Sequence, residues 1–175
     1  DGRFQFVFGQ TEIEVRASVI PGAGGESMVM RLLDPSVASF SIDKLDLNPY
    51  LKVVMERELK RPNGLIITTG PTGSGKTTLM KSLCQSIPAD ERLITIEDVR
   101  ELLLPTHGNR VHLLYSKGGQ GVAKVTPSDL IASAMRMKPD RVLLAELRGG
   151  EAFDFLKLLT TGHSGSITSY HAESC

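Results

Sequence analysis

Residues 70–77 read Gly-Pro-Thr-Gly-Ser-Gly-Lys-Thr, and this stretch decides the fold of the 175-residue chain. A short β-rich apolar run at residues 64–69 precedes it, and a helical pattern at residues 76–87 follows it. Glycines let backbone N–H groups turn inward around an anion, and the start of a helix adds partial positive charge. A strand, a glycine-rich loop and a helix in this order predict a phosphate-binding loop for a nucleoside triphosphate.

The loop residues have distinct predicted tasks. Lys76 is expected to reach the β- and γ-phosphates as a point charge, the Thr77 hydroxyl to ligate Mg²⁺, and Thr78 to lie beside the α-phosphate. The predicted ligand is ATP with Mg²⁺, and the structural alternative is a glycine-rich turn with a solvated lysine. The predicted nucleotide-binding residues of the loop are Gly70, Pro71, Thr72, Gly73, Ser74, Gly75, Lys76, Thr77 and Thr78.

Two further apolar runs, residues 93–96 and 142–145, end on the acids Glu97 and Glu146. In open α/β sheets, ligands bind beyond the carboxyl ends of the strands. A carboxylate there can hold Mg²⁺ through water or orient the attacking water. We expect Glu146 to take this role and to contribute to the metal site, with Glu97 as its rival for the general base. The alternative is that each acid only ends a strand in solvent.

The order of elements predicts an α/β fold. Residues 4–33 alternate apolar and polar side chains around a glycine-rich turn, which predicts an antiparallel meander of strands. From residue 64 onward, strands alternate with helices, which favours a parallel sheet with helices on both faces. Cys84 is expected to be a buried thiol. The predicted buried face of the helix that starts at Thr126 consists of Leu130, Ile131, Ala134 and Met135.

Composition excludes some classes of protein. The chain has 20 Lys+Arg and 20 Asp+Glu residues, so its net charge gives no argument for a nucleic-acid partner. A hydrophobic content of 41% is enough for a packed core. No apolar run approaches the roughly 18 residues of a membrane-spanning helix. The sequence also lacks an initiator Met, and both of its ends look cut.

Histidines and arginines give weaker signals. His163 and His171 flank the predicted last strand, residues 166–170, where an imidazole could donate to a phosphate oxygen. Each could equally be a satisfied polar residue. His107 and His112 are treated as structural. Arginines stabilise charge in phosphoryl transfer, but the spacing alone does not select one of them.

Four stretches together resemble the secretion (traffic) ATPase superfamily of type II secretion, type IV pili and type IV secretion or conjugation. Residues 70–77 match its Walker A box and residues 94–98 its aspartate box. Residues 142–146, followed by Leu147-Arg148, match its Walker B box, in which the acid is a glutamate. Residues 162–172 match its histidine box. The four boxes occur in the family's order and span more than half of the chain.

This resemblance implies a RecA-like ATPase domain over residues 46–175, truncated after the histidine box. Residues 1–45 would be the C-terminal β-rich part of an N-terminal domain and its linker. The implied activity is Mg²⁺-dependent ATP hydrolysis that powers macromolecular secretion, conjugation or pilus assembly. The implied partners are further copies in a hexamer and inner-membrane secretion or pilus proteins. The implied location is the cytoplasm, at the inner-membrane face.

The resemblance also assigns residues. By position, Arg16 and Arg31 match arginines that contact the phosphates, and His163 and His171 belong to the histidine box. The first part of the chain is closer to the pilus and type II branch, and the later part to the type IV secretion branch. A chimera and a divergent intermediate both remain open.

Two other functions remain open. One is a phosphotransferase of the phosphate-loop kinase type, which would need an acceptor pocket and an arginine-rich lid. The other is a nucleotide-binding module with little turnover because the domain is truncated.

Overall fold

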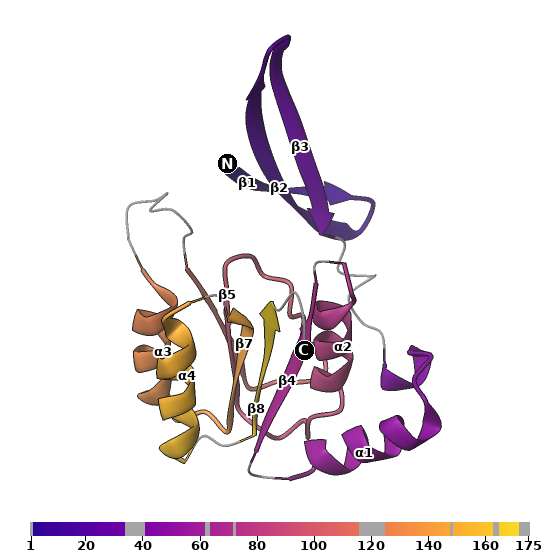
Figure 1. Cartoon of the computed structure of the whole chain (residues 1–175), viewed down its shortest axis with the longest axis vertical. Coiled ribbons are helices and arrows are strands. Elements are labelled where there is room, and N and C mark those ends of the chain that lie inside the picture. The colour runs from indigo at the N-terminus through magenta and orange to yellow at the C-terminus, as the bar shows by residue number, and fades with distance from the viewer. Residues whose placement is uncertain are drawn as a thin grey trace. The chain divides into compact units, whose positions relative to one another are not determined.

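The computed structural model describes residues 2–33, 41–61, 64–71, 73–115, 125–147, 149–162 and 165–171. By their internal contacts these residues form two compact units, 1–39 and 40–175, which are described separately (Figure 1). The domain boundary after residue 45 stays a prediction.

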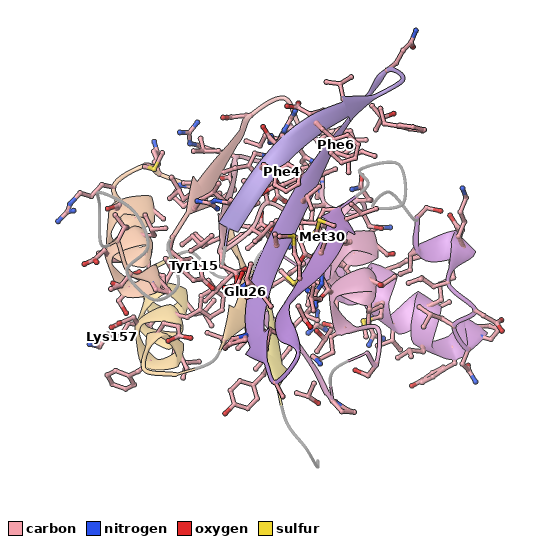
Figure 2. All side chains as sticks on the ribbon, turned by 90° about the horizontal axis from the view of Figure 1, so that it is seen from above. Phe4, Phe6, Glu26, Met30, Tyr115 and Lys157 are labelled. Atoms are coloured by element: carbon pink, nitrogen blue, oxygen red, sulfur yellow. The ribbon has the colours of Figure 1, made fainter. Side chains whose placement is uncertain are left out.

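The first unit is a three-stranded antiparallel sheet of β1 (Gly2–Phe8), β2 (Thr11–Gly22) and β3 (Gly25–Leu33). It has the expected meander topology. In the ladder, Phe4 lies opposite Val15, and Val15 lies opposite Leu32, so one face of the sheet is apolar. Phe4 and Phe6 are labelled on this sheet in Figure 2.

The opposite face of this sheet carries a row of arginines. Arg3 pairs with Arg16 across β1 and β2, and Arg16 pairs with Arg31 across β2 and β3. Like charges directly opposite one another are destabilising in a sheet. Arg16 and Arg31, the two arginines selected by the resemblance, therefore lie side by side on this face, and Arg3 lies next to Arg16.

The second unit alternates helices and strands. Its elements are η2 (Ile42–Lys44), α1 (Pro49–Leu59), β4 (Leu65–Gly70), α2 (Lys76–Cys84), β5 (Leu93–Glu97), β6 (Arg110–Leu114), α3 (Pro127–Met135), β7 (Arg141–Leu147), α4 (Glu151–Thr160) and β8 (Ser166–His171). The described strands form a parallel sheet in the order β4-β8-β7-β5-β6. Helices α3 and α4 lie together on one side of this sheet and α2 on the other (Figure 1). The predicted α/β fold with a parallel sheet is confirmed.

Local signals explain where two helices begin. The Asn48 side chain accepts a hydrogen bond from the Tyr50 N–H at 2.9 Å, and Pro49 occupies the first turn of α1. Thr126 and Asp129 form a reciprocal capping box at the start of α3. These side chains satisfy amide donors that a helix leaves unpaired at its N-terminus.

The core consists of two clusters, one on each face of the parallel sheet. Leu143 packs with Met80 and Leu83 of α2. Its neighbour Leu144 packs on the other face, with Phe155 and Leu158 of α4. Adjacent residues of a buried strand point to opposite faces, so β7 is apolar along nearly its whole length.

Burial agrees with the expectations for most core positions. Cys84 is fully buried, and burial raises the pKa of its thiol to about 12. Ile131 and Ala134 are buried, and Leu130 is partly buried. The expectation for Met135 is wrong, because 38% of this residue is exposed. Met135 ends α3 and lies beside the exposed Thr161, so it sits at the rim of the helix pair rather than beneath it.

We expect Phe155→Ala to lower the free energy of unfolding by about 3–5 kcal/mol, because it leaves a cavity in the fully buried cluster under α4. The matched control is Phe153→Ala on the same helix, where 65% of the residue is exposed and the ring contacts Lys157. That change should cost about 1 kcal/mol or less. Urea denaturation of both variants measures the difference, and equal losses would contradict the assignment of this core.

Candidate nucleotide-binding site

The loop between β4 and α2 has a backbone that requires glycine. Gly70, Gly73 and Gly75 have φ values of 148°, 82° and 86°, a region in which side chains are strained. A Cβ on Gly70 would also lie 2.7 Å from the Ser74 Oγ. The loop therefore curls tightly from the end of the strand into the first turn of α2, where unpaired N–H groups attract an anion.

Lys76 is held across this loop. Its Nζ donates hydrogen bonds to the carbonyl oxygens of Gly70 at 2.6 Å and Pro71 at 2.7 Å. Two of the three donors of the ammonium group are used in this way. The charge is thus fixed at the loop by the protein itself, which lowers the entropic cost of placing it on a phosphate.

Strand β8 lies between β4, which leads into the phosphate loop, and β7, which carries Glu146. Tyr170 of β8 pairs with Thr69 of β4 on one side and with Leu147 of β7 on the other. Neighbouring strands are about 4.8 Å apart, so the ends of β4 and β7 are separated by about 10 Å. The half-buried Glu146 directly precedes Leu147. It therefore lies near the carboxyl end of β7, at the end of the sheet where the phosphate loop begins.

A bulge sets the position of Glu146. Between the pairs Leu144–Thr168 and Leu147–Tyr170, two residues of β7 face one residue of β8. The Ser169 hydroxyl donates to the Ala145 carbonyl at 2.6 Å, and the Thr168 hydroxyl donates to the Leu144 carbonyl at 2.8 Å. These two bonds from β8 hold the irregular part of the strand.

The bulge reverses the direction of side chains along β7. Ala145 packs against the cluster on the α2 face, whereas Leu147 belongs to the cluster on the α3–α4 face. In a regular strand both residues would point to the same face. The run of residues 142–147 carries no signal for the bulge, so sequence reasoning missed it.

Glu97 has a different environment from Glu146. It is fully buried, and its Oε2 accepts hydrogen bonds from the N–H groups of Glu101 at 2.8 Å and Leu102 at 2.9 Å. Burial raises the pKa of this carboxyl to about 7, although the two backbone bonds favour its charged form. One oxygen of Glu97 is therefore used to hold the turn that follows β5. Its role as general base stays a prediction.

A cavity of about 500 Å³ lies beside the loop. The loop and α2 contribute polar atoms to it, and the segment before α1 contributes apolar side chains. Its lining includes Leu45, Leu47, Met55, Ser74, Gly75, Lys76, Thr78 and Leu79. Sequence reasoning did not assign Leu45, Leu47 and Met55 to the site. The available signal was the pair of leucines in an otherwise polar stretch before α1.

The described oxygen donors suit Mg²⁺. Mg²⁺ binds hard oxygen ligands and commonly retains several waters. Thr77 offers a half-buried hydroxyl at the start of α2, and Glu146 a half-buried carboxylate. Among the described residues there is no group of three or more His, Cys, Asp or Glu side chains that could hold a metal ion. A site that uses Thr77, phosphate oxygens and water therefore fits better than a cage made of protein ligands alone.

Several predicted residues lie outside this description. Thr72, Arg148 and His163 are not among the described residues, and the side chain of His171 is not described either. Arg16 and Arg31 belong to the first unit, whose position relative to the loop is not defined. Their assigned roles stay predictions.

A protein-family model described as "Type II/IV secretion system protein" matches residues 1–175. The chain belongs to this family. This match confirms the predicted superfamily, and the relatives and solved structures described next confirm the type IV branch, predicted for the later part of the chain, and the RecA-like fold.

Two curated relatives are proteins of type IV secretion systems. The chain is 60% identical to "Type IV secretion system protein VirB11" of Brucella suis over 113 residues, which is 63% of this chain and 31% of that protein. It is 56% identical over 110 residues to "Type IV secretion system protein PtlH" of Bordetella pertussis, covering 62% of this chain and 32% of the relative. The matched residues span about a third of the length of these relatives.

Solved structures of secretion ATPases superpose on nearly the whole chain. The VirB11 ATPase of Brucella suis, crystallised with sulphate, has a TM-score of 0.63 and 38% identity, and the match covers 99% of this chain and 56% of that one. The pilus retraction motor PilT has a TM-score of 0.68 at 24% identity, covering 99% of this chain and 48% of its own. The PilT match supports the fold alone.

No helix among the described residues is both long enough and apolar enough to cross a membrane.

We expect the contribution of Glu97 to the free energy of unfolding to fall as pH rises from about 4.5 to about 7. The folded state binds the proton more tightly than the unfolded state, so Glu97 stabilises the fold below pH 4.5 and loses this contribution as it ionises. The loss amounts to about 3 kcal/mol. Glu97→Gln should remove it, so the variant gains stability relative to the wild type between pH 4.5 and 8. Parallel urea titrations at these pH values test this, and curves that keep a constant separation would contradict the raised pKa.

Proposed function

We propose that this chain binds ATP with Mg²⁺ and hydrolyses it, as the motor part of a type IV secretion machine. One observation carries the proposal. Carbonyl groups of the loop already bind the Lys76 ammonium group. A half-buried acid, Glu146, lies at the same end of the sheet, on the second strand from β4. The membership of the chain in the secretion ATPase family supports this proposal.

Each part of the site has a task in this reaction. The N–H groups of the loop and the first turn of α2 would hold the phosphates, with Lys76 on the β- and γ-phosphates. Bound Mg²⁺ would neutralise charge on the phosphate oxygens, with Thr77 as its protein ligand. Glu146 would orient the attacking water or accept its proton.

The cavity beside the loop suits the nucleoside. Thr78 and Lys76 line the part that belongs to α2, where the α-phosphate would leave the loop. Leu45, Leu47 and Met55 offer apolar surface for a base. The segment before α1 would thus form the wall of the cavity that contacts the base.

The complete machine belongs to the same proposal. Arg16 and Arg31 of the first unit would add positive charge to the phosphates, and His163 and His171 would act near the γ-phosphate. We propose a hexamer at the cytoplasmic face of the inner membrane, in contact with secretion or pilus proteins. A rate per subunit that rises steeply with protein concentration would support catalysis across subunit interfaces, and a rate independent of concentration would contradict it.

The alternatives differ in the fate of the phosphate. Transfer of labelled γ-phosphate to an added acceptor rather than to water would identify a phosphotransferase. Nucleotide binding with background phosphate release would identify a binding module.

Lys76→Ala should abolish turnover and weaken ATP binding at least ten-fold, because the variant loses the ammonium group that the loop carbonyls hold in place for the phosphates. Lys81→Ala is the matched control, since Lys81 lies on the same helix but pairs with Glu101 at 3.3 Å. Calorimetry and phosphate release measure the two effects. Unchanged turnover in Lys76→Ala would contradict the assignment of the site.

Glu146→Gln should slow hydrolysis about 100-fold or more while ATP binding stays within a few-fold of the wild type. The amide keeps the size of the side chain but cannot accept a proton. Glu56→Gln on α1 is the control, because the Glu56 side chain is 44% exposed and its carboxylate pairs with Lys52 at 3.9 Å, and it should leave both values unchanged. Loss of ATP binding in Glu146→Gln would instead assign this residue to the metal or to the structure of the bulge.

A further inference from the structure

An acid in the wall of the cavity beside the phosphate loop has no task in the proposed mechanism. Asp46 lines this cavity together with its neighbours Leu45 and Leu47. Asp46 is exposed, and it makes no hydrogen bond or ion pair with the residues that the structure describes. Both oxygens of its carboxylate are therefore available as hydrogen-bond acceptors.

The backbone holds Asp46 in place. The Leu47 N–H donates to the Leu45 carbonyl at 2.7 Å, which closes a three-residue turn with Asp46 at its centre. Before this turn, the Leu45 N–H donates to the carbonyl of the buried Ile42 at 3.3 Å, and after it Asn48 caps α1. Ile42 belongs to the core cluster on the α2 face, and Leu47 packs against that cluster. The segment that carries Asp46 is therefore anchored at both ends.

Positive and negative charge lie on different segments of the cavity wall. Lys76 and the first turn of α2 provide positive charge, and Asp46, on the segment before α1, provides negative charge. A triphosphate is attracted to the first and repelled by the second. The hydrogen-bond donors of a nucleotide, by contrast, belong to its nucleoside, as the ribose hydroxyls and the amino group of the base. The acid is therefore suited to the nucleoside end of the ligand, while the triphosphate occupies the loop.

The ribose suits Asp46 better than the base does. Leu45, Leu47 and Met55 are the part of the wall that suits a flat apolar base. Asp46 is exposed to water, and contact with a solvent-accessible sugar avoids the cost of burying its charge. The adjacent 2′- and 3′-hydroxyls also present two donors side by side, which match the two oxygens of one carboxylate. An acid has this same task on the ribose in dinucleotide-binding folds.

We propose that Asp46 binds the ribose hydroxyls of the nucleotide and so selects a ribonucleotide over its deoxy analogues. This role of Asp46 rests on the proposed function, because it concerns the same site. The contact is made equally before and during hydrolysis, so Asp46 contributes to affinity and not to the chemical step.

The test compares Asp46→Ala with Asp43→Ala, which removes an equal charge three residues earlier in the chain. Asp43 pairs with Lys52 and is not part of the cavity wall. Calorimetry measures the binding of ADP and of 2′,3′-dideoxy-ADP, both with Mg²⁺. The wild type and Asp43→Ala should bind ADP about ten-fold more tightly than the dideoxy analogue, and Asp46→Ala should bind the two equally. If Asp46→Ala loses the same affinity for both ligands, the acid does not act on the ribose and the proposal is overturned.

Two further readouts separate ribose binding from other roles of Asp46. Pyrophosphate, which has no nucleoside, should bind Asp46→Ala at least as tightly as the wild type, because a repelling charge is lost. In turnover of ATP, Asp46→Ala should raise KM about ten-fold and leave kcat within about two-fold of the wild type. Weaker binding of pyrophosphate would show that the variant disturbs the phosphate loop, and a kcat about ten-fold lower would assign Asp46 to the chemical step. Either result would overturn the proposal.

These measurements distinguish the role of Asp46 from the proposed function. If Lys76→Ala loses nucleotide binding but Asp46→Ala keeps the preference for the ribose, the site stands and the role of Asp46 is wrong. If the ribose preference depends on Asp46 but the wild type releases no phosphate from ATP, the role of Asp46 stands and the proposed hydrolysis is wrong.

Discussion

The hydrogen-bonded ladder of β8 between β4 and β7 is the constraint on which the site depends. It keeps the strand that leads into the phosphate loop in register with the strand that carries Glu146. The Thr168 and Ser169 hydroxyls extend this control, because they bind carbonyls of β7 where the ladder becomes irregular. Strand β8, about twenty residues after Glu146, thus positions this acid relative to a loop about seventy residues before it.

Several polar groups are buried within the parallel sheet. Thr168 and Ser169 of β8 and Thr95 and Glu97 of β5 are all buried, on two strands that β7 separates. Burying such groups is costly unless they are hydrogen-bonded, and most of these bind backbone or one another. The apolar clusters on the two faces supply the stability that this arrangement requires. The sheet is therefore well packed although it buries these polar groups.

Local patterns predicted much of this structure. The parallel sheet, the antiparallel meander and the caps at Asn48 and Thr126 all follow from short-range sequence signals, and the structure contains them. Predictions were weaker where the position of a side chain depends on distant segments. Met135 has the spacing of a buried residue but lies at the rim, since its exposure depends on where α4 ends beside it.

The sequence by itself determined the phosphate loop, because glycine conformations, a helix start and a lysine are local properties of residues 70–77. It also determined that acids end two of the strands. Only the tertiary structure decided that these acids differ: Glu97 is turned inward onto the amides of the next turn, whereas a bulge leaves Glu146 half-buried at the edge of β7. The tertiary structure also brought His112 next to Thr95. It placed Leu45 in the wall of the cavity beside the loop. Those placements depend on strand order and on packing between segments far apart in the chain, which no local pattern specifies.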